Sequence, residues 1–189
     1  MLSLRGKYAL ITGATDGLGK QTALEFAKQG VNLIIHGRNK EKVNKVISEI
    51  QAENTSINIE SVVCDLTMTQ EIEKAFSQIN TLDILVNNAG VWLEGDTLDA
   101  TSEKIIELTH INLLAPMLIT RTVLPKLLQA EFSQILNIVS IAGVEIPAGY
   151  YHTIYSAVKF GLQGFSEAMA KEFFNKNHLH YFPVSRARI

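Results

Sequence analysis

The stretch Tyr8–Gly19 reads YALITGATDGLG, a short apolar run followed by a glycine-rich turn, and the helical pattern of residues 17–29 follows directly. Glycines at this place allow a tight turn and let the backbone come close to a pyrophosphate. The start of a helix adds free N–H groups and the positive end of its dipole. A turn that merely needs glycine can have the same residues, so the position directly after a first strand is what favours a dinucleotide site.

Short apolar runs alternate with longer helical patterns along the rest of the chain. We expect strands at residues 8–12, 32–36, 57–64, 82–86 and 134–139, and helices at residues 17–29, 40–53, 69–79, 102–129 and 153–176. Several strands are apolar on both faces, which suits a parallel sheet covered on both sides. The alternation predicts one α/β domain over residues 1–189, a doubly wound Rossmann-type parallel sheet with helices on both faces. Pro116 and Pro125 predict a kink or a break in the fourth helical stretch.

Composition limits the class of protein. The chain has 189 residues, of which 47% are hydrophobic and 19% are charged, enough for one sizeable core. The net charge is −2 and no block of one sign occurs, which argues against binding to nucleic acid or to a membrane surface. No uncharged apolar stretch approaches the about 18 residues that span a bilayer, and the first apolar run is too short for a signal peptide. We therefore expect a cytoplasmic protein.

Cysteine and histidine give little sign of cross-links or metal. Cys64 is the one cysteine, so an internal disulfide is excluded, and we expect it to be a small buried residue. The five histidines show no metal-ligand grouping, and we expect no metal site.

The ends of the second, third and fourth strands carry further candidates for a cofactor site. The second strand ends in His36-Gly37-Arg38-Asn39, without the carboxylate that commonly holds the ribose 2′-hydroxyl of NAD. Arg38 is either a ligand for a 2′-phosphate or a solvated surface residue, and the pattern favours NADP(H) over NAD(H). Asp65 follows the third strand, where its carboxylate could accept from an adenine amino group. Asn87-Asn88-Ala89-Gly90 follows the fourth strand and either lines a cofactor crevice or makes a turn.

Tyr155 and Lys159 lie four residues apart in the last helical pattern and should share one face. A phenol has a reference pKa of about 10. A neighbouring ammonium group favours the phenolate and lowers that pKa toward the range where a general acid or base works well. The same spacing also occurs on ordinary amphipathic helices, so the pair indicates a catalytic function only together with the motifs that precede it.

Taken in order, these motifs resemble those of the classical short-chain dehydrogenase/reductase family. The matching residues are Thr12-Gly13-x-x-x-Gly17-x-Gly19, Asp65, Asn87-Asn88-Ala89-Gly90, Asn112, Ser140 and Tyr155-x-x-x-Lys159, within about residues 5–176. The resemblance implies that Tyr155 exchanges a proton with the substrate oxygen as a hydride moves to or from the nicotinamide. Lys159 would favour ionisation of Tyr155 and bond the nicotinamide ribose. Ser140 would bond the carbonyl oxygen, and the Asn112 amide would hold a water in a proton relay.

The resemblance also implies a cofactor-binding set and a function. The set is Gly13, Thr15, Asp16, Gly17, Leu18, Gly19, Arg38, Asp65, Leu66, Asn88, Ala89, Gly90, Tyr155 and Lys159. The implied function is hydride transfer between NADP(H) and a small carbonyl or secondary-alcohol substrate. Trp92, Leu93 and residues 144–152 either contact that substrate or are loop residues that pack on the core. Homo-oligomers would form through the helices that carry Asn112 and Tyr155.

The chain departs from the family pattern at three places, one of which is a slightly longer gap from Ser140 to Tyr155. Neither Thr15 nor Asp16 is basic, although NADP-preferring members often have a basic residue in that turn. After residue 174 the family continues with a sixth strand, a Pro-Gly turn, a helical lid over the substrate and a seventh strand. Here residues 179–183 could form a sixth strand, but no Pro-Gly follows. We expect the C-terminal strand or strands and the lid to be missing or altered, which leaves an open sheet edge. The alternative function is therefore a catalytically silent dinucleotide-binding or interaction protein.

Overall fold

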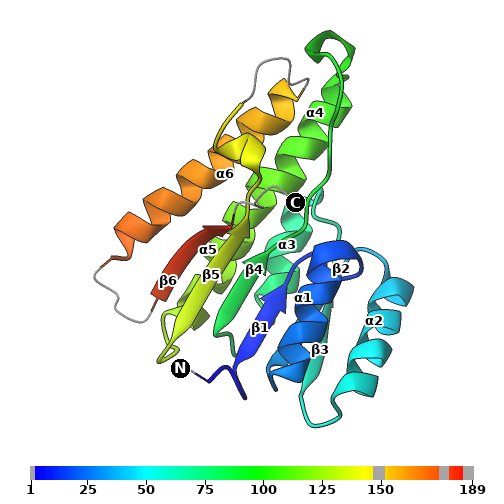
Figure 1. Ribbon diagram of the computed structural model, residues 1–189, viewed down its shortest axis with the longest axis vertical. Coiled ribbons are helices and arrows are strands. Elements are labelled where there is room, and N and C mark those ends of the chain that lie inside the picture. Colours follow the sequence, from blue (N-terminus) through cyan, green and yellow to red (C-terminus); the bar gives the residue numbers. More distant parts are fainter. Residues whose placement is uncertain (1–2, 147–151, 175–178, 185–189) are drawn as a thin grey trace.

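The computed structural model describes residues 3–146, 152–174 and 179–184. Six parallel strands form one sheet in the order β3-β2-β1-β4-β5-β6 (Figure 1). The strands are β1 (Tyr8–Ile11), β2 (Asn32–Gly37), β3 (Ile59–Val63), β4 (Ile84–Asn87), β5 (Ser133–Ile138) and β6 (Leu179–Val184). The predicted doubly wound parallel sheet is confirmed, and the sixth strand that the sequence left open is present. The strand order reverses between β1 and β4, and at such a point α/β sheets bind their ligands.

Helices cover the two faces of this sheet, as predicted. α1 (Gly17–Lys28) and α2 (Lys40–Glu53) lie on one side, and α3 (Thr69–Phe76), α5 (Ala115–Leu127) and α6 (Thr153–Glu172) lie on the other (Figure 1). The side chains of each strand alternate between the two cores. In β1, Leu10 belongs to the core beneath α3 and α5, whereas Ala9 and Ile11 belong to the core beneath α1 and α2. All three are fully buried, which explains why the strand is apolar on both faces.

The fourth helical stretch is divided into three parts. α4 (Ser102–Thr109) leads into a π-helical turn, His110–Leu114, and α5 then begins at Ala115. Pro116 lies in the first turn of α5, where a missing N–H costs little, so the predicted break is confirmed there. At Pro125 the helix is not split, because α5 continues to Leu127.

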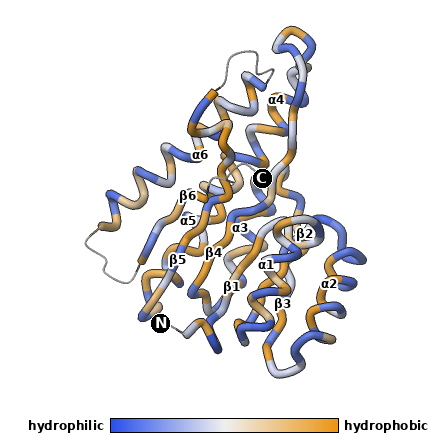
Figure 2. Tube along the Cα trace, viewed as in Figure 1, coloured by the Kyte–Doolittle hydropathy of each residue, from blue (hydrophilic) through white to orange (hydrophobic). Residues whose placement is uncertain are grey.

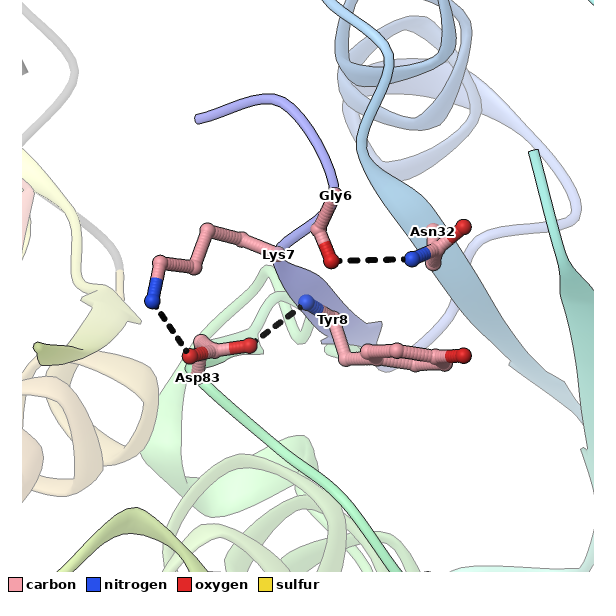
Figure 3. Close-up of polar contacts among 5 residues, drawn as sticks. All are labelled: Gly6, Lys7, Tyr8, Asn32 and Asp83. Atoms are coloured by element: carbon pink, nitrogen blue, oxygen red, sulfur yellow. Dashed lines mark hydrogen bonds and ion pairs between the residues drawn. The ribbon is translucent and has the colours of Figure 1, made fainter. Parts of the chain in front are cut away.

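Asp83 fixes the amino ends of the central strands (Figure 3). Its nearly buried carboxylate accepts hydrogen bonds from the backbone N–H of Tyr8 at 2.8 Å and from Lys7 Nζ at 3.1 Å. Asn32 Nδ2 donates to the carbonyl oxygen of Gly6 at 2.9 Å on the other side of β1. These bonds tie the start of β1 to the starts of its two neighbours in the sheet, β2 and β4.

The sheet is unevenly covered (Figure 2). Within the described residues, the helices on the α1 side lie over β1, β2 and β3 (Figure 1). Leu136 and Ile138 of β5 are only partly buried, and Phe182 of β6 is 45% exposed. Apolar side chains of β5 and β6 are therefore partly exposed on this face of the sheet. None of the described helices combines the length and the apolar character that crossing a membrane requires.

Candidate active site

A cavity of about 460 Å³ opens beside the carboxyl ends of the first four strands. Its walls come from the turn after β1, the ends of β2 and β3, the segment after β4 and one residue of the π-helical turn. The lining residues are Gly13, Thr15, Asp16, Gly17, His36, Gly37, Arg38, Cys64, Asp65, Leu66, Asn88, Ala89, Gly90, Val91 and Ile111. The cavity therefore brings together most of the residues that the sequence predicts for a cofactor, from four separate segments.

The glycine-rich turn is packed too closely for larger residues. Gly13 has a φ of 62°, and a Cβ at this position would lie 2.8 Å from the Cα of Ala89. A Cβ on Gly19 would lie 2.5 Å from the carbonyl oxygen of Gly13 and would also meet the side chain of Asn88. Asn88 Nδ2 in turn donates to the carbonyl oxygens of Thr12 at 2.9 Å and Gly13 at 3.1 Å. Gly19 thus acts by letting α1 approach the turn, and it is not among the residues that line the cavity.

The first turn of α1 is capped by an acidic residue. Asp16 is the N-cap, and its carboxylate accepts from the backbone N–H of Gly17 at 2.7 Å. Thr15 is half-buried, and its methyl group leaves no room for a side chain at Gly37. Leu18 is 45% exposed and does not line the cavity. Asp16 and Thr15 border the cavity at the positive end of the α1 dipole.

Asp65 and Arg38 bring opposite charges to the cavity. The Asp65 carboxylate accepts from the backbone N–H of Thr67 and from its hydroxyl, both at 2.9 Å. The backbone bond contributes most to lowering the pKa of Asp65, and the nearby Arg38 guanidinium contributes further, although burial opposes the shift. Arg38 is exposed at the end of β2, and Leu66 is buried beside Asp65. The cavity thus offers an ionised carboxylate on one strand and an accessible cation on the next.

Asn112 is fully buried in the π-helical turn and holds the segment that follows β4. Its Oδ1 accepts from the backbone N–H of Val91 at 3.1 Å, and its Nδ2 donates to the carbonyl oxygen of Val91 at 2.9 Å. A Cβ on Gly90 would lie 2.7 Å from the same Oδ1. Both ends of the amide are therefore bonded to the backbone that lines the cavity. Its role in a proton relay stays a prediction.

Tyr155 and Lys159 share one face of α6, as their spacing predicts. Both are buried, and Lys159 Nζ lies 5.7 Å from the centre of the Tyr155 ring. Nζ also donates to the carbonyl oxygen of Ile138 at 3.0 Å. Burial lowers the pKa of Lys159 to about 8, because the ammonium group has lost most of its water.

Ser140 lies two residues after the end of β5 and caps a short 3₁₀ turn, Ile141–Gly143, that packs against α6. Its Oγ accepts from the backbone N–H of Ala142 at 3.2 Å. Ala142 is buried in the same apolar cluster as Tyr155. Gly143 has no room for a side chain, because a Cβ would lie 2.8 Å from the carbonyl oxygen of Lys159. The turn that carries Ser140 is thus pressed closely onto the helix that carries Tyr155 and Lys159.

Aromatic side chains lie beside Tyr155. The Trp92 ring is centred 4.4 Å from the Tyr155 ring and 4.5 Å from the His152 ring, yet Trp92 is 53% exposed. Leu93 packs against the cluster that contains Tyr155. Residues 144–146 of the expected substrate region are exposed, and residues 147–151 lie outside the described residues. Trp92 thus presents about half of its surface to solvent directly beside Tyr155.

The sequence reasoning missed some residues of this site. His36, Gly37, Cys64, Val91 and Ile111 line the cavity but were not predicted to do so. Gly37, Cys64 and Val91 lie next to predicted residues in the chain and His36 lies two residues before Arg38, so proximity was the available signal. Among the described residues, no group of three or more His, Cys, Asp or Glu side chains could hold a metal ion.

Comparisons with known proteins show which family the chain resembles. A family model described as short chain dehydrogenase matches residues 7–178. A 3-oxoacyl-[acyl-carrier-protein] reductase of Rickettsia bellii is 36% identical over 172 residues, which are 91% of this chain and 68% of the relative. A very-long-chain 3-oxoacyl-CoA reductase of Mus musculus is 34% identical over 180 residues, 90% of this chain and 56% of the relative. The chain thus spans between about half and two thirds of the length of these two relatives.

Solved structures share the overall fold. A metagenomic short-chain oxidoreductase in complex with NADP has a TM-score of 0.88 and 30% sequence identity, and the match covers 100% of this chain and 85% of that one. The bulky-bulky ketone specific alcohol dehydrogenase from Comamonas testosteroni has a TM-score of 0.86 and 29% identity, covering 96% of this chain and 73% of that one.

Proposed function

The chain belongs to the short-chain dehydrogenase family of oxidoreductases, and on that premise we propose that it transfers a hydride between NADP(H) and a carbonyl or secondary-alcohol substrate. One observation carries the proposal. Val91 lines the cavity at the strand ends and also packs against the apolar cluster that contains Tyr155, although neither Tyr155 nor Lys159 lines the cavity itself. A dinucleotide in the cavity would therefore lead toward a buried phenol and a buried ammonium group.

The residues of the cavity fit a dinucleotide. Gly13 and Gly19 have no space for side chains, so the backbone and the start of α1 are open to phosphates. Asp65 is ionised and suits a hydrogen-bond donor such as the adenine amino group. The end of β2 carries the exposed Arg38 and no carboxylate, which supports a preference for the 2′-phosphate of NADP(H). The NADP in the metagenomic relative supports the same proposal.

The catalytic roles follow from the chemistry of the side chains. The bound nicotinamide would supply the hydride to the carbonyl carbon, or accept it in the reverse direction. The Tyr155 hydroxyl gives its proton to the carbonyl oxygen, so that a neutral alcohol forms, and Lys159 stabilises the phenolate left behind. Ser140 Oγ donates a hydrogen bond to the same oxygen and stabilises its developing charge. Asn112 keeps the segment at Val91 in place, and we retain it as the candidate for the proton relay.

Trp92 and Leu93 supply an apolar wall beside the reacting oxygen. Such a wall suits a substrate with apolar groups next to its carbonyl. A 3-oxoacyl thioester, a simple ketone and a hydroxysteroid-like alcohol all meet this condition. The names of the two reductases compared above favour 3-oxoacyl thioesters as the first compounds to test.

Replacing Tyr155 tests the catalytic assignment. Tyr155→Phe keeps the ring and removes the proton donor, so turnover should fall by about a thousandfold, within the range for a general acid. The dissociation constant for NADPH should stay within about threefold of the original, because the ring and Lys159 remain. NADPH oxidation with a panel of carbonyl compounds and nicotinamide fluorescence measure the two quantities.

Tyr181→Phe is the matched control. The Tyr181 hydroxyl is buried in β6 and has no hydrogen-bond partner among the described residues, so its removal should leave both turnover and NADPH binding unchanged. Equal turnover by Tyr155→Phe and the original chain would refute the assignment. Tight NADPH binding without turnover by the original chain, over the whole panel, would favour the catalytically silent alternative.

A further inference from the structure

His36 connects two walls of the cavity. It belongs to β2, is 2% exposed, and lies between the glycine-rich turn and the end of β3. Its Nδ1 accepts from the backbone N–H of Gly13 at 3.2 Å. Its Nε2 lies 3.2 Å from the carbonyl oxygen of Cys64. The carbonyl oxygen of His36 accepts from the next N–H of the turn, that of Ala14, at 2.9 Å. One residue thus bonds two successive N–H groups of the glycine-rich turn.

These partners allow only one protonation state of the ring. The N–H of Gly13 can only donate and the carbonyl of Cys64 can only accept, so Nδ1 must be bare and Nε2 must carry the proton. A proton on Nδ1 would point at the N–H of Gly13 and break that bond. Burial lowers the pKa of His36 to about 4, against the opposing influence of the Asp65 carboxylate. The adjacent Cys64 thiol has its own pKa raised to about 11 by burial and stays neutral.

Gly13 needs such a partner more than other residues do. It adopts a positive φ, and glycine loses more conformational freedom on folding than any other residue. We propose that neutral His36 is a positioning residue for the dinucleotide site, because its bare Nδ1 holds Gly13 in the conformation that opens the start of α1 to phosphates. The inference rests on the proposed dinucleotide binding. It assigns His36 to cofactor affinity and not to the chemical step.

Two amide variants separate the two bonds of the ring. His36→Asn places an acceptor oxygen as many bonds from the backbone as Nδ1, so it keeps a partner for Gly13 and loses the donor to Cys64. His36→Gln places an amide nitrogen near the former Nε2, so it keeps the donor to Cys64 and loses the acceptor for Gly13. The readouts are the NADPH dissociation constant from nicotinamide fluorescence and the hydrogen exchange of the Gly13 amide without nucleotide.

We expect His36→Asn to bind NADPH within about threefold of the original chain. His36→Gln should bind about tenfold more weakly or worse, the effect of a buried N–H left without an acceptor. Gly13 exchange should be faster in His36→Gln alone, and in that variant the Michaelis constant for NADPH should rise by a larger factor than turnover falls.

Other outcomes would overturn either the role of His36 or the proposed function. Equal NADPH binding by His36→Gln and the original chain would overturn the role of His36 alone. Loss of NADPH binding by a His36→Asn variant that circular dichroism shows to be folded would also overturn the role of His36. This test remains valid even if His36→Gln does not fold. Absence of NADPH binding by the original chain would instead refute the proposed function, and the role of His36 toward the dinucleotide with it.

Discussion

At the scale of single residues, Lys159 is the clearest case of a side chain that serves function at the expense of stability. Its ammonium group is nearly buried, and its described partners are the carbonyl oxygen of Ile138 and the face of Tyr155. Neither partner is a full negative charge, so the burial of the positive charge is not compensated. An apolar side chain would fill this place on α6 more favourably. The residue thus opposes folding at neutral pH and supplies the charge that the phenolate of Tyr155 requires.

Lys159→Met should therefore stabilise the fold while it abolishes turnover. The folded pKa is about 8 and the ordinary value is 10.5, so the unfolded chain keeps its proton between these values while the folded chain releases it. The stability of the original chain should rise with pH across this window, by about 3 kcal/mol relative to Lys159→Met. Urea unfolding at several pH values measures the difference. Lys171→Met, at an exposed position of the same helix, is the control, and its free energy of unfolding should depend on pH as that of the original chain does.

Protonation of His36 should lower the free energy of unfolding of the chain at acid pH. Its folded pKa of about 4 lies below the ordinary 6.5, so between these values only the unfolded chain takes up the proton. The contribution of neutral His36 to the free energy of unfolding is complete above pH 6.5 and is lost as the pH falls toward 4. Between about pH 7 and about pH 5, the original chain should lose about 2 kcal/mol more than His36→Asn. Asp65 is common to both proteins and cancels in the comparison. Parallel losses in urea unfolding would show that His36 does not titrate in this way.

The types and positions of residues in the sequence predicted most of the site, and there is a physical reason why the other residues were missed. Gly13, Arg38 and Asp65 were predicted because each lies within two residues of the end of a strand that the apolar pattern predicts, and the ends of parallel strands meet at one edge. His36 was missed because its partners are backbone groups 23 and 28 residues away, which no side-chain motif reveals. A histidine between apolar residues gives no sign of which backbone groups it will bond.

At the scale of elements, the π-helical turn is the feature that the sequence did not reveal. Pro116 predicted a break, but the widened turn lies before it and turns the Asn112 amide toward Val91. π-turns occur mostly as single turns inside α-helices, frequently at functional sites. The local pattern could not show this one, because its stabilising partner comes from the segment after β4. The strand and helix order was predictable, because the apolar runs and helical patterns alternate without long loops.

Asn112→Ala should destabilise this part of the chain. The N–H and the carbonyl of Val91 would both lose their partner, and leaving two such groups unsatisfied costs about 2–4 kcal/mol. Asn112→Asp should not restore the stability, because a carboxylate oxygen would then face the carbonyl oxygen of Val91. Urea unfolding and hydrogen exchange of the Val91 amide test this expectation. Full stability of Asn112→Asp would contradict the two-sided hydrogen bonding described here.

At the scale of the whole molecule, the strand order creates the site. The reversal between β1 and β4 separates the segments that follow them, and the cavity lies there with the glycine-rich turn on one side and Asn88–Val91 on the other. The far side of the sheet is less regular, because the α1 face of β5 and β6 remains exposed among the described residues. Assembly through the helices that carry Asn112 and Tyr155 stays a prediction. Sequence pattern alone could predict the layers but not how much of each layer is covered.

Titration of the chain with NADPH and with NADH, followed by nicotinamide fluorescence, tests the central claim most directly. Arg38→Ala should remove the ligand for the 2′-phosphate, and Arg121→Ala, an equally accessible arginine paired with Glu73, is the matched control. We predict that the original chain and Arg121→Ala bind NADPH about 10- to 100-fold more tightly than NADH, and that Arg38→Ala loses most of this preference. Failure of the original chain to bind either nucleotide, or tighter binding of NADH, would contradict the account.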